Sequence, residues 1–83
     1  MKAISTKYRG PTNSRGPRVY ASDGNGNRAS IPYPHELSEI AVHAAAAVAL
    51  CQKMKWSGEL IGGYTRDGCV FVFADSDRFE VTL

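Results

Sequence analysis

The sequence predicts an α+β domain in which one alanine-rich helix packs on a mostly antiparallel sheet. Short β-rich segments bounded by Gly, Pro, Asn and Asp stand on both sides of a single segment with helical periodicity. Runs of strands interrupted by one helix are typical of the α+β class. The 83 residues suffice for one hydrophobic core but not for two. We therefore expect a single domain over residues 1–83, in the order β-β-β-α-β-β, followed by a short closing strand.

The first expected strand, Lys2–Tyr8, alternates between Ile4, Thr6 and Tyr8 on one face and smaller or polar residues on the other. A period of two is typical of a strand with one polar face. The next segment, residues 9–18, carries three arginines, two copies of Arg-Gly-Pro, and no acidic or large apolar residue. Its prolines oppose both a helix and a central strand. We therefore expect a basic surface loop.

A hairpin is expected from the segments 18–22 and 28–33, because they flank the Asp-Gly-Asn-Gly-Asn sequence of residues 23–27. Asp-Gly and Asn-Gly supply the positive φ angles that tight hairpin turns require. The apolar face of the hairpin would consist of small and branched side chains: Val19, Ala21, Ala29 and Ile31.

A helix is expected to begin between His35 and Ser38, after two prolines, and to end near Gly58. Glycine suits the left-handed position that follows a helix C-terminus. Four consecutive alanines keep the middle of this helix thin, so it can lie flat across a sheet. Apolar side chains recur at helical spacing on one side: Leu37, Ile40, Ala44, Ala47, Val48, Cys51 and Met54.

The C-terminal part predicts two strands, Glu59–Tyr64 and Cys69–Ala74, and a closing strand, Arg78–Thr82, with Phe79 and Val81 on one face. The Cys69–Ala74 strand is apolar on both faces, whereas one helix covers only one face of a sheet. The second face is then shielded by the 9–18 loop, by curvature of the sheet, or by another molecule such as a second copy of the chain.

Charge is distributed unevenly along the chain, although the net charge is only +2. Residues 1–34 carry six Lys or Arg and one acidic residue, whereas residues 57–83 carry five acidic residues and two arginines. This gradient indicates either a basic binding face or opposite charges that pair across adjacent strands. No apolar run approaches the roughly 18 residues of a membrane span, and no secretory signal is recognisable. We expect a soluble, cytoplasmic protein that does not associate with membranes.

Catalytic and metal chemistry is poorly supported by the sequence. The four soft or imidazole side chains lack metal-binding spacings, and His43 and Cys51 would stand about 12 Å apart along the helix. Both Cys51 and Cys69 fall in core patterns, where thiols are inert. A catalytic thiol would require a base such as His43 beside Cys69. We predict a protein that is not an enzyme and that uses no cofactor and no metal.

Nucleic-acid binding is the function that the basic N-terminal third favours. Arginines in a Gly/Pro-rich loop can follow a phosphate backbone, and Tyr20 shares the strand face of Arg18, where it can stack on a base. Tyr8 and Tyr33 lie beside the same third of the chain. We predict a small binding module that engages nucleic acid or a nucleoprotein through these residues: Arg9, Arg15, Arg18, Arg28 and Tyr20.

Two resemblances add to this interpretation. The alanine run 44–50, which follows three strands, is similar to the final helix of double-stranded RNA-binding domains. The chain departs from that family in having no preceding helix, and in having Glu36 and Glu39 where the family has a lysine cluster.

A longer set of segments resembles short proteins carried by bacterial mobile elements: residues 10–13, 23–27, 31–33, 53–58, 62–63 and 70–73. Accessory proteins of such elements often block host defence complexes, including CRISPR effectors. This resemblance implies an alternative function, a protein-binding inhibitor whose arginine loop contacts an acidic or RNA-contacting surface of its target.

Overall fold

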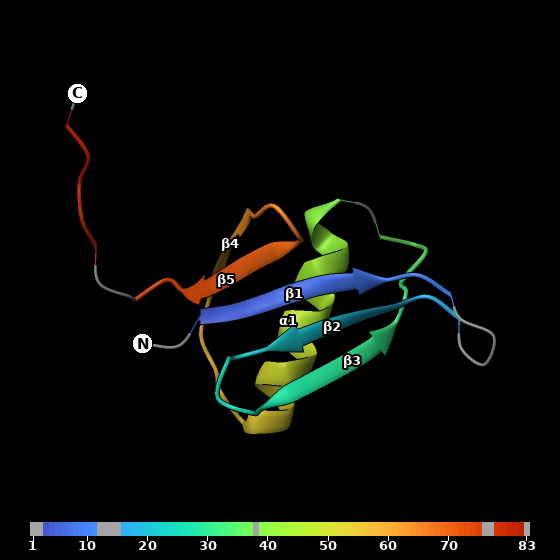
Figure 1. The fold of residues 1–83 in the computed structure, drawn as a ribbon. Coiled ribbons are helices and arrows are strands. Elements are labelled where there is room, and N and C mark those ends of the chain that lie inside the picture. The colour runs from blue at the N-terminus through green and yellow to red at the C-terminus, as the bar shows by residue number, and fades with distance from the viewer. Residues whose placement is uncertain (1–2, 12–15, 38, 76–77, 83) are drawn as a thin grey trace.

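The computed structural model describes residues 3–11, 16–37, 39–75 and 78–82, and it has the predicted α+β architecture. A five-stranded antiparallel sheet, in the spatial order β3-β2-β1-β5-β4, packs on one helix. In Figure 1 the strands lie in front of α1, which runs across them. The elements are β1 (Ala3–Arg9), β2 (Arg18–Ser22), β3 (Arg28–Pro32), α1 (Ile40–Met54), β4 (Leu60–Tyr64) and β5 (Cys69–Phe73).

The predicted β2–β3 hairpin is confirmed, and its turn explains why it forms. Asp23 Oδ1 accepts hydrogen bonds from the backbone N–H groups of Asn25 at 2.8 Å and Asn27 at 3.3 Å. Gly24 and Gly26 adopt positive φ angles of 80° and 94°, which glycine reaches without steric cost. The turn therefore holds β2 and β3 in register, with Ser22 opposite Arg28.

The core lies between α1 and the inner face of the sheet. Ala46 and Ala47 are fully buried, so the thin middle of the helix approaches the strands closely, as predicted. Complete burial of a side chain such as Leu50 contributes about 2 kcal/mol. The buried apolar side chains come from β1, β2, α1 and β5: Ile4, Val19, Ala21, Val42, Ala46, Ala47, Leu50, Cys51, Cys69 and Phe71.

The predicted helix boundaries are wrong at both ends. The helix begins at Ile40, because the segment after Pro34 closes a separate turn in which the Leu37 N–H donates to the Pro34 carbonyl at 3.0 Å. At the other end Lys55, with φ 60°, occupies the left-handed position expected for Gly58. Trp56 packs against the core. The chain therefore leaves the helix before Gly58, at the point that lets the indole reach the core.

The buried side of α1 is also rotated from the predicted one. Its most buried row includes Val42, Ala46 and Leu50, whereas Val48 is 44% exposed. Leu37 precedes the helix and is exposed. A wide apolar arc does not specify which of its edges meets the sheet, so contact with the strands made that choice.

The predicted closing strand is not formed by residues 78–82. Phe79 is 91% exposed and Val81 is 87% exposed, and the segment leads away from the sheet (Figure 1). β5 already pairs with β1 on one side and β4 on the other. Residues 78–82 also do not pair with either edge strand of the sheet, β3 or β4.

Candidate nucleic-acid interface

The sheet has an inner face against α1 and an open face on the opposite side. Directly paired residues of antiparallel strands point to the same face. Ile4 and Thr6 point inward, so the alternate residues Lys7 and Arg9 point outward. Their register partners on β2 are Tyr20 and Arg18, respectively. The open face therefore carries the charged side chains of β1 and β2.

The next strand extends this arrangement. Tyr20 stands opposite Ser30, and Ser22 stands opposite Arg28. We use the term basic face for six residues of β1, β2 and β3 on the open side of the sheet: Lys7, Arg9, Arg18, Tyr20, Arg28 and Ser30. Four predicted site residues thus converge on one surface. The fifth, Arg15, lies outside the described residues.

Tyr20 is the centre of the basic face. The guanidinium carbon of Arg9 lies 5.7 Å from the centroid of the Tyr20 ring, which is within cation–π range. The two residues on either side of Tyr20 across the sheet are Lys7 and Ser30. An aromatic ring is therefore flanked by a long cationic side chain on one strand and a small hydroxyl on the other.

Arg18 is anchored across the hairpin. Its Nη2 donates a hydrogen bond to Ser30 Oγ at 3.0 Å. Its Nε is buried and has no hydrogen-bond partner within the described residues. The protein therefore holds Nη2 and covers Nε, so an anionic acceptor such as phosphate would meet the remaining guanidinium N–H donors.

Acidic side chains do not neutralise the basic face. None of the five strands contains Asp or Glu. In the part of the chain that the structure describes, none of the cations Lys7, Arg9, Arg18 and Arg28 forms an ion pair with a carboxylate. Charge pairing across adjacent strands, the simpler interpretation of the charge gradient, is thus not observed there.

Lys7 is the residue that sequence reasoning missed. The alternation placed it on the polar face of the first strand, but its position beside Tyr20 depends on the β1–β2 register. In that register Arg9 stands opposite Arg18. If residues 9–18 are taken as the loop of a hairpin between the first two strands, with Arg9 opposite Arg18, then Lys7 stands opposite Tyr20 and belongs to the site.

Tyr8 and Tyr33, in contrast, do not join the basic face. They form an edge-to-face pair with ring centroids 5.4 Å apart. Together with Glu39 and Val42 they line a small pocket near the start of α1. The sheet separates this pair from Tyr20, so Tyr20 is the tyrosine of the N-terminal third that faces outward.

The remaining half of the open face, on β5 and β4, is apolar. Val70 and Val72 are half-buried, and Ile61, the register partner of Val72, is 54% exposed. The described ends of the 9–18 loop stay at the tip of the β1–β2 pair (Figure 1), where the Tyr33 N–H donates to the Pro17 carbonyl at 3.0 Å. In these described parts the loop does not cover β5.

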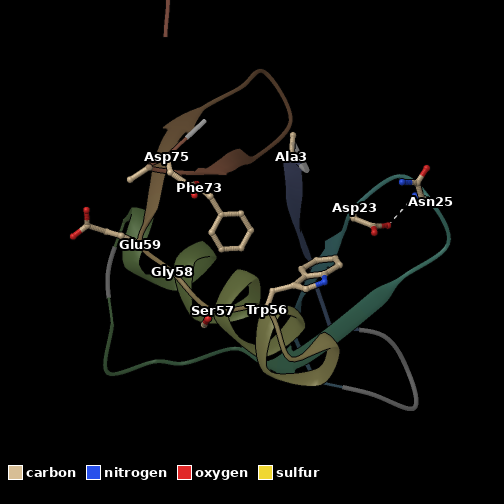
Figure 2. Close-up of a pocket in the computed structure, with 10 residues that line it drawn as sticks. Ala3, Asp23, Asn25, Trp56, Ser57, Gly58, Glu59, Phe73 and Asp75 are labelled. Atoms are coloured by element: carbon tan, nitrogen blue, oxygen red, sulfur yellow. Dashed lines mark hydrogen bonds between the residues drawn. The ribbon is translucent and has the colours of Figure 1, made fainter. Parts of the chain in front are cut away.

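An open groove of about 960 Å³ lies at the opposite end of the sheet from Arg9 and Arg18. Figure 2 shows the rings of Trp56 and Phe73 directed into it, whereas the Glu59 side chain points away. Asp23 borders the groove, but its carboxylate is bonded within its own turn. The polar groups of the groove therefore do not converge on a common point.

The buried polar centre of the domain lies around Thr6. Its hydroxyl oxygen is 2.8 Å from His43 Nδ1, and the hydroxyl donates to the Cys69 carbonyl at 3.4 Å. The imidazole tautomer sets which of His43 and Thr6 donates in this contact. Burial lowers the pKa of His43.

Both cysteines are buried and free. Burial raises the pKa of the Cys51 and Cys69 thiols; for Cys69 a hydrogen bond with Thr6 partly opposes this effect. This environment disfavours the thiolate that a catalytic cysteine requires.

Metal-binding clusters and membrane-spanning helices are both absent from the described residues. These residues contain no group of three or more His, Cys, Asp or Glu side chains placed to hold a metal ion. They also contain no helix with the length and apolar character needed to cross a lipid bilayer.

Comparison with known proteins gives no match: no protein-family model, no curated protein and no solved structure is detectably similar to the chain.

Proposed function

We propose that this protein is a small non-catalytic binding module that engages nucleic acid or a nucleoprotein through the basic face. The observation that carries this proposal is the convergence of four cations around Tyr20 on a surface without acidic side chains among the described strands. Guanidinium groups stay charged at physiological pH and present several N–H donors to phosphate oxygens.

Binding of this kind has a recognisable dependence on salt. Each phosphate that a Lys or Arg neutralises releases condensed counterions, so affinity falls as salt rises. The slope of log K against log salt is about −0.9 per contact on duplex DNA and about −0.7 on a single strand. Four cations therefore set an upper limit of about −3 to −4 for the basic face.

The test is fluorescence anisotropy with labelled oligonucleotides between about 50 and 200 mM salt. The wild-type chain is compared with Arg28→Gln, which removes one charge from the basic face, and with Lys55→Gln, which removes one charge at the end of α1. We expect Arg28→Gln to weaken binding and to reduce the salt slope by about one contact. Absence of binding at low salt, or binding that ignores salt, contradicts the proposal.

A second measurement separates nucleic acid from a protein target, the alternative that the resemblance to mobile-element proteins implies. The chain is used to capture partners from a bacterial lysate with and without nuclease. Direct nucleic-acid binding predicts that co-purified material is lost after nuclease treatment. A protein that is retained after nuclease treatment, and lost with Arg28→Gln, would contradict the proposal and favour the inhibitor.

A further inference from the structure

We infer that the basic face accepts a single strand rather than a duplex, with one base stacked on Tyr20 between phosphates bound near Arg18 and near Arg28. This inference rests on the proposed function and identifies the class of nucleic acid. It follows from three features of the open face: the element that forms it, the position of its aromatic ring, and the chemistry of the surface beside it.

The element that forms the basic face is the flat surface of a three-strand segment of the sheet. Duplex readout usually requires a helix or a narrow two-stranded ribbon that enters a groove. Here α1 lies on the other side of the sheet (Figure 1), so it cannot enter a groove that the basic face contacts. A flat sheet surface with an aromatic side chain instead suits unpaired bases.

Tyr20 lies midway between cations along β2. Arg18 is two residues before it, and Ser22, which stands opposite Arg28, is two residues after it. Two residues of a strand span about 7 Å, so the rows of Arg18 and Arg28 are about 13 Å apart with the ring between them. A strip this short holds only a few nucleotides, with phosphates at its ends and a base at its centre.

The Tyr20 ring can contribute affinity only if it can contact the flat side of a nucleobase. Bases of a duplex are stacked within the helix, whereas a single strand can place a base flat on an aromatic ring. On one side of Tyr20 stands Ser30, a small residue whose hydroxyl holds the Arg18 guanidinium. Stacking would replace the contact of Arg9 with the ring and would release the Arg9 guanidinium to a phosphate.

The surface beside the basic face supports the same inference. Val70 is the register partner of Ser5, and Val72 is the partner of Ala3. The open face thus passes from cations to apolar side chains across β1. A duplex presents phosphates along its outer surface, whereas a single strand presents both phosphates and exposed bases. A surface that is half cationic and half apolar therefore complements the single strand.

The test compares one labelled sequence as a single strand and as a duplex of equal length, at the same low salt. The proteins are wild type, Tyr20→Phe and Tyr20→Leu, and thermal unfolding of each establishes that the variants are folded. We expect wild type and Tyr20→Phe to bind the single strand about tenfold or more tightly than the duplex. Tyr20→Leu should lose about tenfold in affinity for the single strand and keep its weaker affinity for the duplex.

The possible failures are distinguishable. If the duplex binds as tightly as the single strand, or if Tyr20→Leu binds the single strand like wild type, the single-strand inference is wrong although nucleic-acid binding stands. If folded wild-type protein binds neither form, the proposed function is wrong.

Discussion

The two faces of the sheet are built from the same strands, yet they differ in almost every physical property. On β1, Ile4 and Thr6 are buried against α1 and Cys69, whereas their neighbours Ser5 and Lys7 are exposed. A shift of one residue in strand register would exchange these two sets. The inner face therefore specifies the register, and the register in turn brings together the cations of the open face.

The largest expected effect comes from a pair of adjacent substitutions on β1. Ile4→Ala removes a fully buried side chain and should lower the free energy of unfolding by about 2–5 kcal/mol. Ser5→Ala, on the open face, should change it by less than about 0.5 kcal/mol. Urea denaturation measures both. Equal losses for the two variants would show that the faces are not divided as described.

A second pair tests the faces on β4, where two consecutive glycines point to opposite sides. A Cβ at Gly62 would overlap the ring of Phe71, whereas a Cβ at Gly63 meets nothing within 4 Å. Gly62→Ala should therefore cost about 1–3 kcal/mol through overpacking. Gly63→Ala should be neutral or stabilising by up to about 1 kcal/mol, since alanine has less backbone entropy to lose. Chemical denaturation of the two variants decides between these expectations.

The third prediction concerns the open face and leaves the inner face intact. The double variant Arg9→Gln/Arg28→Gln should lower affinity for an oligonucleotide by about ten- to a hundredfold at low salt, because two phosphate contacts are lost. Its midpoint of urea unfolding should stay close to that of wild type, since both arginines are exposed. A large loss of stability would instead assign these arginines a structural role.

The smallest expected effect is a pH dependence of stability that comes from His43. Burial lowers its pKa in the folded state below the ordinary value of 6.5. The unfolded chain therefore binds a proton first, and stability should decrease as pH falls below about 6.5. Glu39 lines the same pocket as His43. Denaturation of wild type and His43→Asn on both sides of pH 6.5 measures the difference; an unchanged pH dependence in the variant excludes His43 as its source.

Local chemistry explains which parts of the fold were predictable. The β2–β3 hairpin follows from the hydrogen bonds of Asp23 and the positive φ angles of two glycines, all within five residues. No distant contact is needed to form it. The strands were recognised for a similar reason, since alternation of side chains is a property of neighbouring residues. The ends of α1 were not predictable in this way. Its C-terminus depends on Trp56 reaching the core, which is a contact with another layer of the molecule.

The same distinction applies to the candidate site. The residue types of the basic face and the shared strand face of Arg18 and Tyr20 are properties of the sequence, because alternation along a single strand places both residues on the same side. How separate strands pair, in contrast, decides three features: the positions of Lys7 and Arg9 beside them, the location of Tyr8 on the other side of the sheet, and the missing closing strand. Pairing between strands is a long-range choice, made by the fit of the inner face against α1, and it is this fit that placed the cations of the basic face around Tyr20.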